Sequence, residues 1–443
     1  MSLWDKIFSK KEEVKDVEGI KAYFGRFTDA YKSTEQYEAW DKAVLHFENR
    51  DFQDAIAEFI NYIQDKSEHN VSKLASGALD FDILQGSKTI MVRTKNGQIR
   101  VNCKIAHADQ LHIGFMRRLL DLNYELKYVR YGLSEDEVIQ LLFDTALEDA
   151  SPYKLYFALK ELAIHADKQD DLLVDEFSFL KPIRSGQIES LPVAEVKLKT
   201  DFFYSSINKA LQIVDQGKLK IEQYPAAGGY ILLALLYKLD YLVRPEGSMM
   251  DRIEQIHKSY FSQDNKNQLH KLKSLRQDLS LMGQQNEETL IRDLHHSIFT
   301  FGVTSPGNTA MVMEVLDREI NNIQWYLDNH HHEYAIAIVE YAVGICLFNF
   351  ALPDPIKDLF TLVYRVTEPA FFDSIDNYEK LALPSGLPDK SAIKSALHRI
   401  EKMHQKVYPG FALDARQLDY SQVSYFVHSL ILQVRKIQMQ KSK

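Results

Sequence analysis

The chain is poor in the residues on which loop-rich or cross-linked folds depend. Its 443 residues include 18 glycines, 12 prolines and two cysteines. The turns of β-sandwiches need glycine and proline, so this scarcity disfavours such folds and favours long helices. Cys103 and Cys346 are too few for a disulfide framework or a cysteine-rich zinc site. We expect two buried, reduced thiols and, with them, a cytoplasmic location.

An excess of basic charge is also lacking. The 53 lysines and arginines face 62 aspartates and glutamates, which gives a formal net charge of −9. Nonspecific binding of nucleic acid requires a basic surface, so we expect no nucleic-acid partner. The most apolar stretch, 226–243, contains Lys238 and Asp240 near its end. We interpret it as a core helix rather than a membrane span, which needs about 20 mostly apolar residues.

The first residues do not form a secretory signal, because residues 1–16 lack an apolar core of about 7–15 residues. Leu3, Trp4, Ile7 and Phe8 nevertheless stand at helical spacing among lysines. Two interpretations stay open: an amphipathic helix over residues 3–11 that docks on a membrane surface or a partner, and a tail that packs on the protein itself. A single short cationic helix binds membranes weakly, so any such contact would be peripheral.

The motifs of common enzymes are missing. The sequence has no phosphate-binding Walker loop, no glycine-rich dinucleotide turn after a strand, no nucleophile elbow and no His-Glu-x-x-His helix. Ser151 and Lys154 match the Ser-x-x-Lys spacing, but Pro152 favours a helix cap at Ser151 instead. We therefore assign no catalytic residue, expect no cofactor, and favour a non-enzymatic protein.

Histidines and paired charges are the remaining candidates for chemistry. His330, His331 and His332 stand together beside Glu333, and His295 and His296 are expected on another helix near Asp293. Imidazoles and carboxylates are common metal ligands, but consecutive residues cannot easily face one ion. We expect no metal site, and interpret 330–332 as a solvated loop at a helix end.

Two carboxylates, two arginines and one glycine-rich loop complete the candidates. Asp80 and Asp82 share one face of a strand and could do acid–base work if buried, although a solvated polar face is favoured. The pair 117–118 could clamp an anion, with solvated helix charge as the alternative. The loop 224–230 leads into a helix whose N-terminus could hold an anion, but close helix packing explains its glycines equally well.

The first half of the chain predicts an α+β module. Apolar spacing gives a helix pair over 34–66 that begins at a capping box of Ser33 and Gln36. Alternation over 78–106, with a turn at Asn96-Gly97, gives a three-stranded antiparallel meander. A helix at 110–122 and a fourth strand at 124–128 follow. Residues 137–147 fit a strand or a helix, and a helix begins at Ser151-Pro152.

The second half predicts helices alone. Residues 181–200 read as a linker, because Pro182, Gly186 and Pro192 interrupt any long element. We expect helices near 207–214, 226–243, 249–261, 266–282, 286–300, 312–327, 333–350, 355–365, 393–407 and 423–437. The predicted organisation is an N-terminal segment (1–33), an α+β module (34–180), a linker (181–200) and a larger all-α domain (201–443).

The order of elements from 34 to 175 resembles the type III secretion chaperone-like fold shared with the YbjN family. The resemblance lies in the meander 79–106, the passage Arg117–Tyr124 and the stretch Ser151–Asp167. It implies a strand pair after the first helix, which favours a strand at 137–147. It also implies a small, non-enzymatic, often dimeric protein that binds other polypeptides. The long helical domain after the module departs from that family.

Three functions follow as hypotheses. The first is a protein-interaction, regulatory or chaperone-like role with a protein partner or a second copy of the chain, through a sheet edge or a helix groove. The second is an enzyme or small-ligand-binding protein with a pocket in the helical domain. The third is a peripheral scaffold recruited by residues 3–11.

Overall fold

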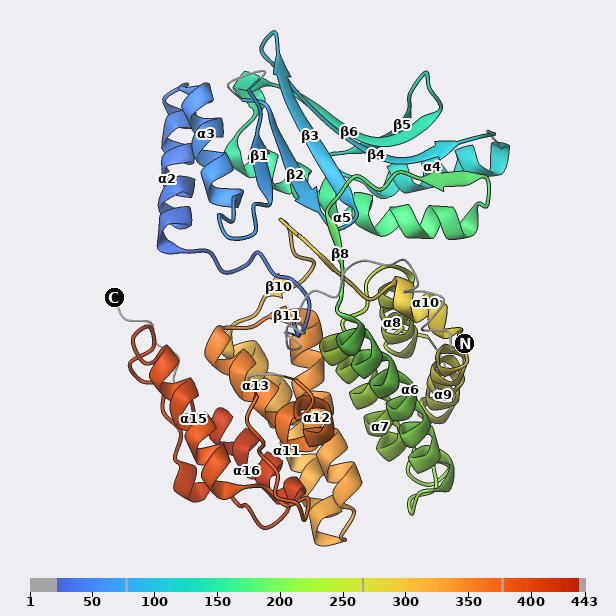
Figure 1. Cartoon of the computed structure of the whole chain (residues 1–443), viewed down its shortest axis with the longest axis vertical. Helices are drawn as coiled ribbons and strands as arrows, with labels where there is room; N and C mark the ends of the chain where they lie inside the picture. The colour runs from blue at the N-terminus through green and yellow to red at the C-terminus, as the bar shows by residue number, and fades with distance from the viewer. Residues whose placement is uncertain (1–21, 76–78, 111, 265–266, 376–377, 438–443) are drawn as a thin grey trace.

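The computed structural model describes residues 22–437, apart from 76–78, 111, 265–266 and 376–377. It has two bodies, an α+β module and a helical region, with extended segments between them (Figure 1). The helix pair, the antiparallel sheet and the helical region from Val193 to Val434 confirm the predicted fold class. Residues 3–11, for which a docking helix and a packed tail both stayed open, lie outside the described residues.

The helix pair consists of α2 (Thr34–Glu48) and α3 (Phe52–Ile63). The predicted capping box is present, because Ser33 Oγ accepts from the backbone of Gln36 while the Gln36 side chain accepts from the backbone of Ser33. The apolar face of α3 is buried against the sheet. The helix pair therefore covers one end of the module (Figure 1).

The sheet is antiparallel, with the strand order β1-β2-β3-β4-β6-β5, and β7 pairs with β4 beside this path. Its strands are β1 (Val71–Lys73), β2 (Phe81–Gln85), β3 (Lys88–Lys95), β4 (Gln98–Ala108), β5 (Arg130–Leu133), β6 (Val138–Ala146) and β7 (Leu180–Pro182). The Asn96-Gly97 turn joins β3 to β4 with positive φ at both residues, as its sequence predicts. Alternate residues face one core, shared with α4 (Ile113–Glu125) and α5 (Pro152–Glu176).

The ambiguous segment 137–147 forms strand β6, as the resemblance favours. Gln98 pairs with Ala146 and Val101 with Phe143 along the β4–β6 ladder. Ser134 does not cap a helix; its Oγ accepts from the backbone of Val138 in a tight turn, and Glu137 takes a positive φ of 58°. The capping-box spacing here marks a turn between two strands.

The prediction of a strand at 124–128 is wrong. Helix α4 begins at Ile113, after the expected start at 110, and continues through Tyr124 to Glu125, while strand β5 begins at Arg130. The short alternation of 124–128 was too brief to outweigh helical spacing, since Leu120 and Tyr124 stand one helical turn apart on α4.

The region 181–200 holds regular structure in place of a long linker. Strand β7 ends at Pro182, β8 (Ile188–Ser190) pairs with β9 (His295–Ser297), and α6 (Val193–Gln216) begins directly after Pro192. Strand β8 fits between Gly186 and Pro192, while β7 ends at Pro182 and α6 begins after Pro192. The β8–β9 pair also corrects the expected helix over 286–300, because α10 (Glu287–Arg292) ends before it.

The helical region contains little else but helices. They are α6, α7 (Pro225–Lys238), a π-helical turn (Leu239–Val243), α8 (Gly247–Tyr260), α9 (Gln268–Gly283), α10, α11 (Thr309–Asp328), α12 (His332–Asn349), α13 (Asp354–Thr367), α14 (Pro369–Phe372), α15 (Lys390–His404) and α16 (Val423–Val434). The expectation of helices alone is corrected by β9 and by a two-residue parallel pair, β10 (Ser305–Pro306) with β11 (Phe350–Ala351).

Helices α7 and α12 form the centre of this region and are buried on most sides. Among the described helices, the span Pro225–Val243 has the length and apolar composition to cross a membrane, but 89% of it is buried inside the protein. It is a core helix, as expected. Cys103 and Cys346 are both buried, and neither forms a disulfide within the described part of the chain. Burial raises the pKa of the Cys346 thiol to about 12.

Candidate functional site

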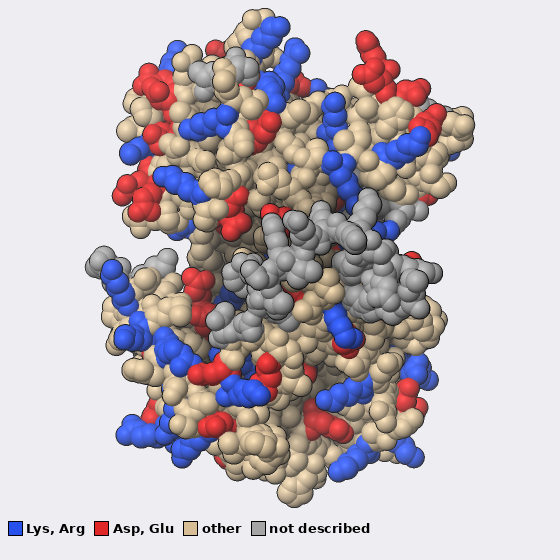
Figure 2. Space-filling model, viewed as in Figure 1, with Lys and Arg blue, Asp and Glu red and all other residues tan. Residues whose placement is uncertain are grey.

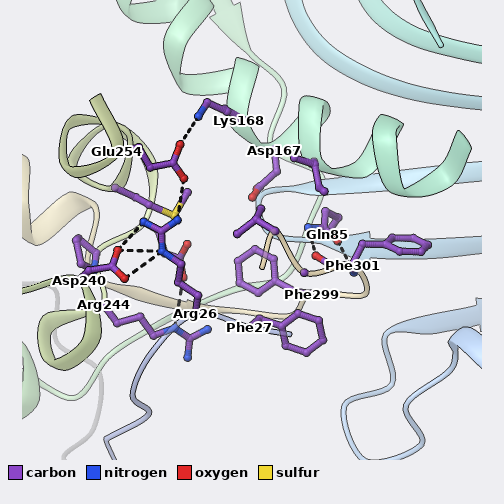
Figure 3. A pocket seen from close by; sticks show the side chains of 16 residues that line it. Arg26, Phe27, Gln85, Asp167, Lys168, Asp240, Arg244, Glu254, Phe299 and Phe301 are labelled. Atoms are coloured by element: carbon purple, nitrogen blue, oxygen red, sulfur yellow. Dashed lines mark hydrogen bonds and ion pairs between the residues drawn. The ribbon is translucent and has the colours of Figure 1, made fainter. Parts of the chain in front are cut away.

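A cavity of about 290 Å³ lies where the two bodies meet (Figure 3). It is bounded by the segment before α2, the end of β2, the second half of α5, the chain after the π-helical turn, α8 and the loop after β9. Its lining residues are Arg26, Phe27, Gln85, Ile164, Asp167, Lys168, Asp240, Arg244, Pro245, Glu246, Met250, Glu254, Phe299, Phe301, Gly302 and Val303. The cavity therefore belongs to the junction and to neither body alone.

The chain after α7 gives the cavity its irregular wall. The helix widens into a π-helical turn over Leu239–Val243 and stops at Arg244, which takes a left-handed conformation with φ 49°. Proline at 245 disfavours helical geometry at the preceding residue, so the dipeptide Arg244-Pro245 itself ends the helix. A left-handed backbone costs free energy at a residue other than glycine. Such residues, like π-helical turns, are frequent at functional sites.

Arg26 is the centre of the charged wall. Its Nη2 lies 2.6 Å from Asp240 Oδ1, and its Nη1 lies 2.8 Å from Glu254 Oε1. Burial alone would lower the pKa of Arg26, but the two carboxylates outweigh it and raise that pKa above its usual value. The preceding Gly25 has φ 71° and passes so close to Tyr241 that a Cβ there would lie 2.7 Å from its ring. Arg26 is thus a fixed structural cation.

Lys168 joins the two bodies across the same wall. Its Nζ lies 2.7 Å from Glu254 Oε2 and 2.9 Å from Asp251 Oδ1, so α5 of the module is bonded to α8 of the helical region. Together these pairs lower the pKa of Glu254, against the effect of its burial.

The apolar wall comes from two loops. The rings of Phe27 and Phe299 stack with centroids 6.0 Å apart, and Phe301 is buried within the core of the α+β module. Gln85 fixes this loop, because its Oε1 accepts from the backbone of Thr300 and Phe301 and its Nε2 donates to the carbonyl of Phe301. These bonds hold the loop after β9 as a rigid side of the cavity.

Arg244 and Glu246 differ from the other charged groups of the wall. The Arg244 Nε lies 3.7 Å from Glu246 Oε1, and among the described residues neither side chain makes a hydrogen bond. Burial raises the pKa of Glu246 to about 7, although Arg244, Arg26 and Lys199 act in the opposite direction. A buried carboxyl and a partly buried guanidinium, neither with a hydrogen bond to a described residue, therefore stand together in the wall of the cavity.

We expect Glu246→Gln to stabilise the protein at pH 8 by about 3 kcal/mol and to have little effect near pH 5. In the folded state the Glu246 carboxyl keeps its proton up to a pKa of about 7. In the unfolded chain the same carboxyl loses its proton near the ordinary pKa of glutamate. The free energy of unfolding of the natural protein is therefore highest at low pH and declines as the pH rises through 7. Chemical unfolding of both proteins at the two pH values measures this; an equal effect at both would contradict it.

A smaller cavity of about 30 Å³ adjoins the first and shares Asp167, Lys168 and Glu246 with it. It brings in Arg184, Arg292, Asp293 and His295. His295 Nδ1 lies 3.2 Å from the carbonyl of Arg292, and burial lowers the pKa of the ring. One of the histidines singled out in the sequence therefore stands next to the junction, on strand β9 where a helix was expected.

The other histidines turn to separate neighbours. His296 stacks on Tyr23 with centroids 4.9 Å apart, His332 Nδ1 lies 3.0 Å from Ser424 Oγ, and His331 packs beside Trp325. His330 occupies a turn with φ 57°. Within the described ranges, no group of three or more His, Cys, Asp or Glu side chains is arranged to hold a metal ion.

The remaining candidates have structural partners. Ser151 Oγ accepts from the backbone of Lys154 at 3.2 Å and caps α5, as Pro152 suggested. Asp80 accepts from the backbone of Thr94 and Asp82 pairs with Arg93, so the two carboxylates do not act together.

Neither the arginine pair nor the glycine-rich loop forms an anion site. Arg118 pairs with Glu176 on the surface, while Arg117 is exposed. Gly228 and Gly229 allow close packing of α7, since a Cβ on either would lie about 3 Å from Leu272 or Tyr260.

A second feature lies on the surface of α4. One face of this helix exposes Ile113 (77%), Met116, Leu120 (66%) and Tyr124 (93%), and Tyr128 and Leu133 continue it at strand β5. We call these six residues the α4 face. Over the side of the molecule drawn in Figure 2, by contrast, basic and acidic side chains are interspersed across both bodies. Runs of large apolar side chains on a surface are typical of contact sites.

Sequence reasoning did not find Arg26, Arg244 or Glu246. The dipeptide Arg244-Pro245 predicts a helix end. No residue near it in the sequence indicates that Arg26 approaches from the other end of the chain. Comparison with models of known protein families finds no match, and comparison with curated protein sequences finds no relative.

Proposed function

We propose that the protein is a non-catalytic interaction protein whose α+β module binds a second copy of this chain through the α4 face. The observation that carries the proposal is the exposure of Ile113, Leu120 and Tyr124 along one helix. These residues recur at helical spacing, so their side chains form a continuous stripe parallel to the helix axis. Water leaves such a stripe when a partner covers it, which favours association.

The edge of the sheet supports the same surface. Among the described strands, β5 pairs with β6 alone and is the last strand on this side of the sheet. Strand β5 follows α4 directly. Tyr128 lies just before this strand and Leu133 is its last residue. An edge strand has backbone groups on its outer side that a partner strand can bond. Helix and strand can therefore bind one partner together.

Charge on α4 favours a second copy as that partner. Arg117 and Arg118 precede Leu120, whereas Asp121 and Glu125 follow it. Two copies of α4 packed antiparallel across a two-fold axis would bring the basic end of each helix towards the acidic end of the other. A surface that is complementary to itself in this way is what a symmetric dimer requires.

The order of elements supports a chaperone-like role within this proposal. From α3 to α5 the module runs helix, four strands, helix, two strands, helix. Apart from the short strand β1, this is the order that motivates the resemblance to the type III secretion chaperone-like fold. That fold is often dimeric and binds polypeptides. The two cysteines are buried and form no disulfide among the described residues, which favours a reducing compartment, so we place this role in the cytoplasm.

We expect Leu120→Glu to weaken self-association at least about thirtyfold, because a charge buried at the centre of the interface has no partner. Sedimentation velocity and light scattering of the full chain at micromolar concentration should show a dimer for the natural protein and a monomer for the variant. Leu45→Glu is the matched control, since Leu45 is an exposed leucine (56%) on α2 of the same module.

Two outcomes would contradict the proposal. A natural protein that stays monomeric throughout the concentration series would show that the α4 face does not bind a second copy. A dimer that survives Leu120→Glu as well as Leu45→Glu would show that the copies associate elsewhere. A second candidate function, binding of a small ligand, is favoured by the cavity at the junction.

A further inference from the structure

We propose that the cavity between the two bodies binds a small organic monoanion, a carboxylate carried on a flat apolar ring, and that Arg244 holds the carboxylate. This site is independent of the α4 face. It rests on three observations: a guanidinium without hydrogen bonds among the described residues, aromatic walls beside it, and a cavity of about 290 Å³ that both border.

The first observation concerns donors. A guanidinium carries five N–H groups. Those of Arg26 are directed to Asp240 and Glu254 at 2.6–3.0 Å. The Arg244 side chain is 15% exposed, yet its nearest described carboxylate oxygen, on Glu246, lies 3.7 Å away. The Arg244 N–H groups therefore have no protein acceptor among the described residues and can bind a ligand oxygen at the cavity wall, and a carboxylate can take two N–H groups at once.

The second observation concerns the body of the ligand. Phe27 and Phe299 stack along one side of the cavity, with Ile164 and Met250 also in its wall (Figure 3). Aromatic rings pack well against such surfaces, and methionine adapts to their shape. The volume is at the lower end of about 300–1,000 Å³ found for ligand pockets. A single ring system with a short acid side chain suits this space.

The third observation limits the charge of the ligand. Arg26 and Lys168 are already paired with Asp240, Glu254 and Asp251. Among the described residues of the wall, Arg244 is therefore the cation left for the ligand, and the Asp240 carboxylate stands nearby. A dianion such as inorganic phosphate would meet more repulsion than attraction here, whereas a monoanion matches one guanidinium.

Glu246 makes this binding depend on pH. It faces Arg244, Arg26 and Lys199 as cations and Asp240 as an anion, and burial raises its pKa to about 7. Below pH 7 the carboxyl is neutral and leaves Arg244 to the ligand. Above pH 7 it is ionised, competes for Arg244 and repels the carboxylate. Affinity for the monoanion should therefore fall as the pH rises through 7.

The test uses the full chain and calorimetric titration with indole-3-acetate, indole-3-acetamide and inorganic phosphate as probes. We expect the acid to bind at least about tenfold more tightly than the amide, because the amide has the same ring without the charge. Phosphate should not bind. Arg244→Gln should reduce the affinity for the acid to that of the amide, whereas Arg416→Gln, an exposed arginine paired with Asp414, should leave it unchanged.

Two further variants keep the test decisive if Arg244→Gln fails to fold. Val303 borders the cavity and is 46% exposed, so Val303→Trp can fill the mouth without disturbing the core and should abolish binding. Glu246→Gln should remove the decline in affinity between pH 6 and pH 8. The proposal is overturned if acid and amide bind equally, if Val303→Trp binds as the natural protein does, or if none of the probes binds.

Discussion

Lys238→Met is expected to lower the free energy of unfolding by about 3–5 kcal/mol, the usual cost of removing one partner from a buried ion pair. The Lys238 Nζ lies 2.8 Å from Glu340 Oε1 and 2.5 Å from Glu368 Oε1 in the middle of the helical region. Burial alone would lower the pKa of Lys238, but the two carboxylates outweigh it and raise that pKa. Methionine would fill the space while leaving Glu340 charged and buried.

Chemical denaturation at pH 7 measures the loss, with Lys380→Met as the matched control. The Lys380 side chain is 74% exposed, and its Nζ lies 3.8 Å from Asp373 Oδ2, a weak surface pair. Its replacement should therefore change stability little. The double variant Lys238→Met with Glu340→Leu should recover part of the loss, because only the more exposed carboxylate of Glu368 then lacks its lysine. A double variant as unstable as the sum of the two single ones would show that the charges are not coupled.

Arg26→Met should cost a similar amount, about 3–5 kcal/mol, for a related reason. Asp240 is 4% exposed and, among the described residues, its carboxylate is bonded to Arg26 alone. The variant also loses the packing of the guanidinium over the ring of Phe348, 4.2 Å from its centroid. The segment before α2 should then detach from the helical region.

Hydrogen exchange of residues 22–33, together with chemical denaturation, distinguishes local detachment from a global loss of stability. Arg26→Lys is the matched control: it keeps the charge but cannot bind Asp240 with two N–H groups, so an intermediate loss is expected. If Arg26→Met and Arg26→Lys are equally stable, the unpaired charge of Asp240 is not what the arginine offsets.

The sequence predicted those features that a few neighbouring residues determine. Ser33 with Gln36, Asn96 with Gly97, and Ser151 with Pro152 each set a cap or turn through their own backbone geometry, and the structure has all three. The strand at 137–147 was ambiguous on such signals, because Ser134 serves a turn as readily as a helix cap.

The features that failed depend on distant partners. Strand β9 exists because His295–Ser297 meets β8 about a hundred residues earlier in the chain, and no pattern within 286–300 shows that pairing. Helix α4 continues past 122 because Tyr124 is tolerated on an exposed apolar face, which a pattern based on burial does not expect. A tertiary contact overrides local propensity at β9, whereas at α4 the helical spacing outweighs a short alternation.

The candidate site lay beyond sequence reasoning for the same reason. Arg26 and Asp240 are 214 residues apart, and Arg26 and Glu254 are 228 apart. A single arginine in a segment without regular structure gives no sign of such partners. The stop at Arg244-Pro245 was recognised, but the lack of hydrogen bonds on Arg244 and the burial of Glu246 are properties of the assembled junction.

The segment 22–33 also constrains the order in which the chain can assemble during synthesis. Asp29 accepts from Tyr156 and Lys160 of the α+β module and from the backbone of Gly302, while Arg26 needs residues 240 and 254. These partners leave the ribosome long after the segment itself. Domains generally fold as units while the chain is being made, so the α+β module can form early. Asp29 can bind Tyr156 and Lys160 once that module has formed, whereas Arg26 stays solvated until residues 240 and 254, beyond half of the remaining chain, have emerged.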